Sequence, residues 1–279
     1  MKQNYFLNHM AAPGLVADDI LLLCKDLELS GVELRNDIGD GDPFNGETPE
    51  NIRQLSASLN VKILTINALQ QCNRSENRGE LLQSLQKIAE IARAAGIEAI
   101  VMCPVNDHDD PRSQEEALRD LETNLRAFAP VLIDAGLTGF VEPLGFPQSS
   151  LRSQAAALRA IESSGETCYK LLLDTFHFAL GPDTFSDLEQ YPTEMIGLIH
   201  VSGVNEAIPR TEMTDDHRLL LGPGDTLETV RQLQAIVERG YRGPIAFEPF
   251  SPLYRSMDRA QVAREVRRSV QYVQESLAQ

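Results

Sequence analysis

The chain has 279 residues, of which 42% are hydrophobic and 24% are charged, and its formal net charge is −16. A surface this acidic repels phosphate backbones and anionic lipid headgroups, so the composition argues against nucleic-acid and membrane partners. The mean hydropathy of −0.22 is typical of a globular protein, and no apolar run reaches the roughly 18 residues that a transmembrane helix needs.

The N-terminus and the cysteines indicate the compartment. The opening stretch MKQNYFLNHM lacks the basic-then-apolar pattern of a signal peptide. The cysteines are scattered without a CxxC pair, as expected for reduced and mostly buried thiols; they are Cys24, Cys72, Cys103 and Cys168. These features predict a cytoplasmic protein.

Short apolar runs alternate with longer helical patterns along the whole chain. The runs that predict strands are 5–10, 31–35, 62–69, 99–105, 138–144, 170–177, 196–203 and 244–250. Between them lie amphipathic stretches such as 80–96 and 115–136, closed by Gly96 and Gly136, and a last helix ends the chain.

The order of these elements predicts the fold class. Strictly alternating strands and helices imply a parallel sheet, and eight such units in about 250 residues are typical of a closed (β/α)₈ TIM barrel. The alternative is an open doubly wound sheet, but no G-x-G-x-x-G follows the first strand. With no domain break visible, residues 1–279 are predicted to form a single domain.

Four consecutive predicted strands end on a side chain that can bind a metal. These residues of strands five to eight are Glu142, Asp174, His200 and Glu248. In a (β/α)₈ barrel the carboxyl ends of the strands meet at one mouth, where active sites lie. Each residue alone has a structural explanation, such as a solvated strand end or a core histidine, but the repetition on four strands favours metal binding.

Two glutamates, an aspartate and a histidine form an oxygen-rich ligand set. Such a set suits Mn²⁺, Mg²⁺ or Co²⁺, and also Zn²⁺ or Fe²⁺, while the lack of thiolate argues against structural zinc. Without a cation, carboxylates this close together would force at least one of them to bind a proton. The sequence therefore predicts one divalent metal ion at the barrel mouth.

Other polar residues near the strand ends are candidates for substrate contacts. His177, three residues past Asp174, is a second ligand, a substrate donor, a group that orients a carboxylate, or a histidine packed under a loop. Glu33 and Arg35 alternate with apolar residues in GVELR, so they either line the mouth or form an ion pair in the barrel floor.

Two further candidates lie on the third strand and after the seventh. Asn67 is expected at the end of the third strand, where its amide would offer polar contacts. Arg218 belongs to the loop DDHRLLLGPGD (215–225), before a helix expected to start near Thr226. An arginine in this loop would bind a substrate hydroxyl or a neighbouring carboxylate.

The motifs FVEPLGFPQSSL, LLLDTFHF, IHVSG and FEPFSPLY, with the DDHR loop, resemble one known group of proteins. They are similar to the xylose-isomerase-like TIM-barrel superfamily of sugar isomerases and epimerases, and within it to the inosose isomerase branch. The resemblance runs from GVELR to the last helix. It implies a homo-oligomer, and it implies that the four strand-end residues bind one divalent metal while Glu142 and Glu248 also act as acid and base.

The implied reaction is the isomerisation of a keto-polyol, with 2-keto-myo-inositol favoured, through an enediolate stabilised by the metal. The alternatives are a ketose 3-epimerase, a hydroxypyruvate-type isomerase, an inosose dehydratase, and a sugar-binding barrel without turnover. Endonuclease IV belongs to the same superfamily, but the five dispersed histidines and the acidic surface do not suit its trinuclear zinc site on DNA.

Overall fold

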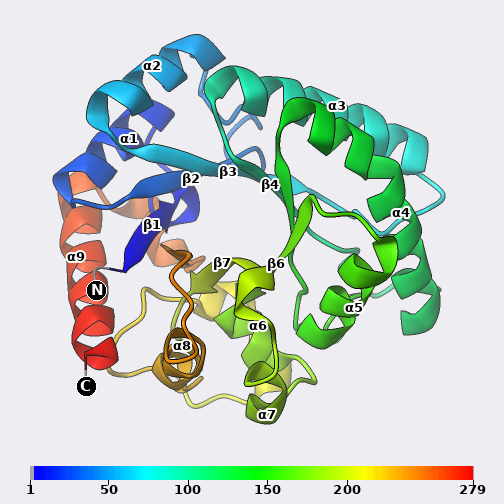
Figure 1. The fold of residues 1–279 in the computed structure, drawn as a ribbon. Coiled ribbons are helices and arrows are strands. Elements are labelled where there is room, and N and C mark those ends of the chain that lie inside the picture. Colours follow the sequence, from blue (N-terminus) through cyan, green and yellow to red (C-terminus); the bar gives the residue numbers. More distant parts are fainter. Residues whose placement is uncertain (1–2, 279) are drawn as a thin grey trace.

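Eight parallel strands close into a barrel in the computed structural model, which describes residues 3–278 (Figure 1). The strands follow one another around the barrel in chain order, and β1 pairs with β8 to close the ring. They are β1 Asn4–Asn8, β2 Gly31–Arg35, β3 Lys62–Leu69, β4 Ala99–Met102, β5 Thr138–Val141, β6 Tyr169–Asp174, β7 Ile196–Val201 and β8 Pro244–Phe247. The predicted (β/α)₈ TIM barrel is confirmed, and the open doubly wound sheet is excluded.

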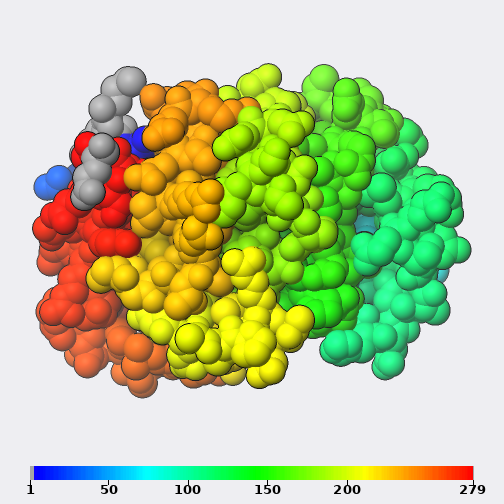
Figure 2. Space-filling model, turned by 90° about the horizontal axis from the view of Figure 1, so that it is seen from below, coloured from blue at the N-terminus to red at the C-terminus, as the bar shows by residue number. Residues whose placement is uncertain are grey.

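Helices surround the barrel on the outside (Figure 1). They are α1 Ala17–Asp26, α2 Pro49–Leu59, α3 Arg78–Ala95, α4 Gln114–Ala135, α5 Gln154–Ser164, α6 Thr175–Leu180, α7 Phe185–Leu188, α8 Thr229–Val237 and α9 Arg259–Leu277. Figure 2 shows how successive parts of the chain lie side by side around the outer surface, from the red C-terminal region through yellow to green. Short 3₁₀ helices occur in the loops: η1 His9–Ala11, η2 Thr193–Met195, η3 Arg210–Glu212, η4 Asp215–His217 and η5 Pro252–Ser256.

Local sequence signals fix the ends of the long helices. Ser113 begins α4 with a capping box, in which its hydroxyl accepts from the backbone N–H of Glu116 and the Glu116 carboxylate accepts from the backbone N–H of Ser113. Gly96 and Gly136 end α3 and α4 with φ of 72° and 70°, a left-handed conformation that glycine adopts without strain. Both glycines are the predicted helix ends.

The barrel interior is filled by apolar side chains. Phe6 and Phe140 lie there among smaller residues of the other strands. A Cβ at Gly31 would stand 2.5 Å from the ring of Phe6, and one at Gly197 would stand 2.4 Å from the ring of Phe140. These two glycines therefore make room for the rings, which close the centre of the barrel below its mouth.

Several predicted strands run too far. The first ends at Asn8 because η1 begins at His9, and the sixth ends at Asp174 because α6 begins at Thr175, so His177 is helical. The fourth, fifth, seventh and eighth also stop earlier than predicted, where the chain enters the loops of the mouth. An apolar run continues through such a loop when its residues are buried, so hydrophobicity alone cannot locate the strand end.

The remaining sequence predictions concern the cysteines, the membrane and the domain. No disulfide joins the four cysteines, all within the described range, and Cys168 is the half-buried one while the others are buried. No helix among residues 3–278 is long and apolar enough to cross a membrane. The predicted domain of residues 1–279 includes Met1, Lys2 and Gln279, which lie outside the described residues.

Candidate metal centre and active site

The four predicted ligands form one layer of inward-facing side chains. Side chains of a strand alternate between its two faces, so residues two apart point to the same side. Phe140, Leu172, Leu198 and Ala246 fill the barrel interior. Two residues further along the same strands come Glu142, Asp174, His200 and Glu248. The ligands therefore stand directly above the apolar filling, at the carboxyl ends of β5 to β8.

The structure brings these four side chains together. One ligand atom from each lies within 4.8 Å of the other three. The Nδ1 atom of His200 is 2.9 Å from Glu248 Oε2, 3.3 Å from Glu142 Oε1 and 3.8 Å from Asp174 Oδ2. Atoms that share one ion with bonds of about 2.0–2.2 Å lie up to about 4.4 Å apart. The observed spread is close to this value, so the donor set fits a divalent metal ion.

The balance of buried charge also calls for a cation. Four carboxylates are buried here, since Glu33 joins the three carboxylate ligands, and two guanidinium groups accompany them, those of Arg35 and Arg218. With a neutral His200, the buried group carries two negative charges more than positive ones. Buried charge without compensation is costly, and one divalent cation would bring the group to neutrality.

The excess of buried negative charge also acts on the pKa of His200. Burial acts against the charged imidazolium, but the negative charges of Glu248 and Glu33 outweigh it and raise the pKa of His200 well above its usual range. Burial likewise acts to raise the pKa of Glu248, but the charges of His200 and Arg218 hold it well below its usual range. Glu248 therefore stays ionised, and the position between it and the other three ligands favours a positive charge.

Two arginines hold Glu248 from opposite sides. Arg35 donates to Glu248 Oε1 at 2.8 Å, and Arg218 donates to Glu248 Oε2 at 2.7 Å. Arg218 also donates to Asp174 Oδ2 at 2.5 Å. Both guanidinium groups face the ring of Phe250, at 5.1 and 4.6 Å from its centroid. Arg35 therefore lines the mouth, as one of its two predicted placements, and its ion pairs are with Glu248 and Asp37, not with Glu33 in the barrel floor.

A cavity of about 200 Å³ opens above the four ligands. Predicted residues that line it are Arg35, Glu142, His177, Arg218 and Glu248. Sequence reasoning missed several other lining residues, including Gln70, Cys103, Phe146 and Phe250. These side chains come from loops or from positions without a recurring pattern, so only the barrel geometry identifies them.

His177 occupies the wall of this cavity through the short helix α6. Asp174 is the N-cap of α6, and its Oδ1 accepts from the backbone N–H of His177 at 3.0 Å. Asp174 therefore places His177 with one oxygen and faces the ligand cluster with the other. The His177 side chain is buried, its Nδ1 has no hydrogen-bond partner in the described structure, and its ring packs edge-on against Phe146. An unpartnered polar atom in a cavity wall is available to a bound ligand.

Two predicted substrate contacts lie elsewhere. Glu33 is fully buried beneath the cavity and bonds to His200, Asn8 and Thr65, so it contacts the ligand cluster and not the open space. Asn67 is also buried, lies within β3 and not at its end, and does not line the cavity. Neither side chain is placed to contact a substrate directly, because the strands bury both.

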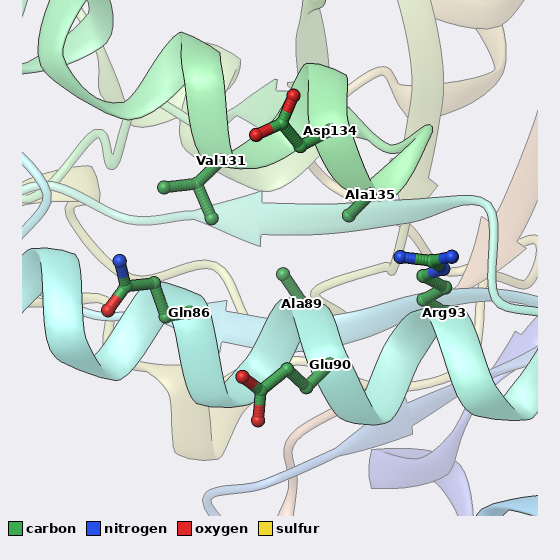
Figure 3. A pocket seen from close by; sticks show the side chains of 7 residues that line it. All are labelled: Gln86, Ala89, Glu90, Arg93, Val131, Asp134 and Ala135. Carbon is green, nitrogen blue, oxygen red and sulfur yellow. The ribbon is translucent and has the colours of Figure 1, made fainter.

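A second hollow, of about 220 Å³, lies on the outside of the barrel between α3 and α4 (Figure 3). Short or charged side chains line it, among them Ala89, Arg93 and Asp134. They come from only two helices, and none of the strand-end residues reaches it. The chemistry of the molecule is therefore concentrated at the barrel mouth.

Comparisons with known proteins agree with this architecture. The model of the family described as xylose isomerase-like TIM barrel matches residues 21–273. This chain belongs to that family. The family resemblance noted from the sequence is thereby confirmed.

Individual relatives have low sequence identity to this chain. The inosose isomerase of Halalkalibacterium halodurans is 25% identical over 240 residues, covering 83% of this chain and 84% of the relative. The crystal structure of a xylose isomerase domain containing protein from Salmonella typhimurium is 31% identical, with full coverage of both chains and a TM-score of 0.90. The IolI protein, solved with a bound zinc atom, has the same TM-score at 19% identity, with 99% of this chain and 100% of that one covered.

Sugar 3-epimerases share the fold at lower similarity. A D-psicose 3-epimerase solved in the presence of D-fructose has a TM-score of 0.74 at 15% identity, covering 99% of this chain and all of that one. At this identity the likeness concerns the fold alone.

Proposed function

We propose that this chain is a divalent-metal-dependent isomerase that moves the carbonyl group of a cyclic keto-polyol to a neighbouring carbon, with 2-keto-myo-inositol as the favoured substrate. The observation that carries the proposal is the convergence of Glu142, Asp174, His200 and Glu248, buried with excess negative charge at the barrel mouth, where the two glutamates line a cavity. The similarity to inosose isomerase supports the choice of substrate.

The coarser assignment rests on the family. The chain is an enzyme of the sugar isomerase and epimerase type, as its family membership and its relatives indicate. A sugar-binding barrel without turnover would not need two glutamates beside the metal position, and this chain keeps both Glu142 and Glu248. The cytoplasmic location and the homo-oligomer stay predictions.

The reaction begins with removal of a proton from the carbon next to the carbonyl. A bound divalent ion would act as a Lewis acid toward the substrate oxygens and lower the free energy of the enediolate. Glu142 and Glu248 are the acid–base groups: one carboxylate removes the proton, and the carboxyl group so formed returns it to the neighbouring carbon, while the other carboxylate carries the hydroxyl proton to the former carbonyl oxygen. Mn²⁺, Mg²⁺, Co²⁺ and Zn²⁺ all suit the proposed ligands.

The two glutamates are held differently, which suits different roles. Both oxygens of Glu248 accept from a guanidinium group, so its position is fixed from two sides. Among residues 3–278, no arginine is hydrogen-bonded to Glu142, and its Oε2 is 3.5 Å from the thiol of Cys103. We therefore assign the removal of the proton to Glu142. His177 and Arg218, on the cavity wall, are assigned to substrate hydroxyl groups.

A ketose 3-epimerase is the second candidate. Epimerisation uses the same enediolate and returns the proton to the original carbon from the opposite face, so it needs the same ligands and two acid–base groups. Glu142 and Glu248, both beside the metal position, meet this requirement as well. A hydroxypyruvate-type isomerase and an inosose dehydratase are the further alternatives.

Proton exchange tests the proposal directly. Metal-depleted protein is loaded with Mg²⁺ or Zn²⁺ and incubated in D₂O with 2-keto-myo-inositol, fructose and hydroxypyruvate in separate samples, and each is followed by proton NMR. We expect deuterium at the carbon next to the inosose carbonyl, together with a new keto-inositol.

The substrates separate the alternatives. Exchange or epimerisation of fructose with an inert inosose would replace the inosose assignment by the ketose epimerase. Loss of water from the inosose would indicate the dehydratase. Binding of a sugar without exchange in any metal-loaded sample would overturn the enzyme assignment.

A further inference from the structure

Glu33 in β2 has hydrogen-bond partners at both of its carboxylate oxygens. Its side chain is fully buried in β2 and takes part in three hydrogen bonds. Thr65 Oγ1 donates to Oε1 at 2.8 Å, while Asn8 Nδ2 at 3.2 Å and His200 Nε2 at 2.9 Å both lie against Oε2. A residue that merely fills the barrel would not need to be a carboxylate.

The direction of these bonds follows from the neighbours of Asn8. Its Oδ1 accepts from the backbone N–H of Met10 at 3.0 Å and from Arg35 Nη1 at 3.3 Å, so the oxygen end of the amide is fixed and Nδ2 must donate to Glu33. An ionised carboxylate can only accept hydrogen bonds. With Glu33 ionised, the proton between Glu33 and His200 resides on Nε2 of the histidine.

A proton on Nε2 determines what the other ring nitrogen can do. In the neutral imidazole, Nδ1 then carries a lone pair, and Nδ1 is the atom that faces Glu142, Asp174 and Glu248. Metal-binding histidines commonly donate their other N–H to a carboxylate, which fixes the tautomer and raises the basicity of the coordinating nitrogen.

We propose that Glu33 is a positioning residue for the metal centre: it holds His200 with the proton on Nε2 and so presents Nδ1 to a divalent cation. This inference rests on the proposed function, since it requires the four strand-end residues to bind a metal. It also replaces the substrate contact predicted for Glu33 from the sequence. The competing explanation is an ion pair that stabilises only the barrel.

A conservative substitution separates the two explanations. The Glu33→Gln variant keeps the size of the side chain and can still accept from His200, but it removes the negative charge. We measure the dissociation constant of Zn²⁺ for metal-depleted protein by competition with a chromophoric chelator, and the unfolding temperature of the metal-free protein. We expect Zn²⁺ to bind about 10- to 100-fold more weakly to the variant.

Glu98→Gln is the matched control, because it removes the same charge from an exposed pair with Lys62. We expect its zinc affinity to match that of the wild type. Equal zinc affinity of Glu33→Gln and wild type would overturn the inference, even if the variant unfolds at a lower temperature. An equal loss in both variants would also overturn it, because a general charge effect would then suffice.

A second measurement needs no variant. In zinc-loaded wild-type protein with ¹⁵N-labelled histidine, NMR distinguishes a ring protonated at Nε2 from one protonated at Nδ1. We expect the His200 proton on Nε2; a proton on Nδ1 would overturn the inference. If the wild type binds neither Zn²⁺ nor Mn²⁺, the proposed function itself fails, which is distinct from a wild type that binds metal without the help of Glu33.

Discussion

The two halves of the barrel make different contributions to the mouth. Strands β5 to β8 supply the candidate ligands, all at equivalent positions just above the apolar filling. Strands β1 to β4 supply the side chains that hold those ligands. Asn8 and Arg35 bond to Glu248, Glu33 bonds to His200, and Cys103 lies against Glu142. Strands β5 to β8 thus carry the candidate metal ligands, and strands β1 to β4 carry side chains that orient those ligands.

Asp174 departs from this division entirely, and Glu248 departs from it in part, since Arg218 also donates to its Oε2. The two oxygens of Asp174 are held by Arg218 and by the backbone N–H of His177, both from the second half of the chain. A ligand can therefore be fixed either across the barrel or by its own following helix. The chemistry of a strand end thus depends on its partners as much as on its residue type.

The largest expected effect comes from a group assigned to the chemical step. Glu142→Gln should lower the exchange rate of the inosose by about 10²- to 10⁴-fold, because an amide cannot accept the proton. Deuterium incorporation measures this rate, and an unchanged unfolding temperature shows that the fold is intact. The Glu98→Gln variant serves as the charge-matched control. Retained exchange in Glu142→Gln would remove Glu142 from the proposed mechanism.

A substitution at Arg218 tests how strongly this residue of the second half of the barrel stabilises the buried carboxylates. Arg218→Met should destabilise the metal-free protein by about 3–5 kcal/mol, since it leaves Asp174 and Glu248 buried without their shared cation. Denaturant titration measures the free energy of unfolding. Arg268→Met removes an exposed pair with Glu265 and should cost about 0–1 kcal/mol. Equal losses in the two variants would contradict the importance of the buried ion pairs.

Metal binding should stabilise the fold by a comparable but smaller amount. Zinc at 100 times its dissociation constant should add about 2.7 kcal/mol to the free energy of unfolding, because the ligands converge only in the folded barrel. The Asp174→Ala variant, which lacks one ligand, should require a higher zinc concentration for the same gain. A wild type whose stability does not respond to any divalent metal would argue against the metal centre.

The smallest expected effect concerns Cys103. Burial, together with the charge of Glu142, raises the pKa of the Cys103 thiol well above its usual range, so it stays protonated and donates weakly to Glu142. Cys103→Ser keeps a donor in place and should change kcat/KM by less than about fivefold, or about 1 kcal/mol. Steady-state kinetics measures this, and a loss as large as that of Glu142→Gln would give the thiol a direct part in the reaction.

The sequence predicted the fold and the ligand layer because both follow from repetition. Alternation of strands and helices gives the barrel, and the same kind of residue at four strand ends gives the cluster. The residues that hydrogen-bond to the ligands follow no recurring pattern in the sequence. Glu33 and His200 are 167 residues apart in sequence, and nothing local to either shows that they meet. The sequence offered an ion pair of Glu33 with Arg35 as one explanation, but their partners in the structure include His200 and Glu248, on distant strands.

The end of β6 at Asp174 shows a second limit of prediction from sequence. The run LLLDTFHF is apolar enough to continue as a strand, and the predicted strand therefore included His177. In the structure the carboxylate of Asp174 caps a helix that begins one residue later. An aspartate is both a common helix cap and a metal ligand, so its identity alone does not say which role it takes.

The pairing of β1 with β8 has a consequence for the order in which the site is made. Asn8 and Glu248, joined by a hydrogen bond, are 240 residues apart, and strands β2 to β8 lie between them. A chain emerging from the ribosome therefore carries Asn8 and Glu33 long before the carboxylate of Glu248 exists. Under the proposed function, the complete ligand set exists only after the ring of strands has closed, so full-affinity metal binding would require a finished barrel.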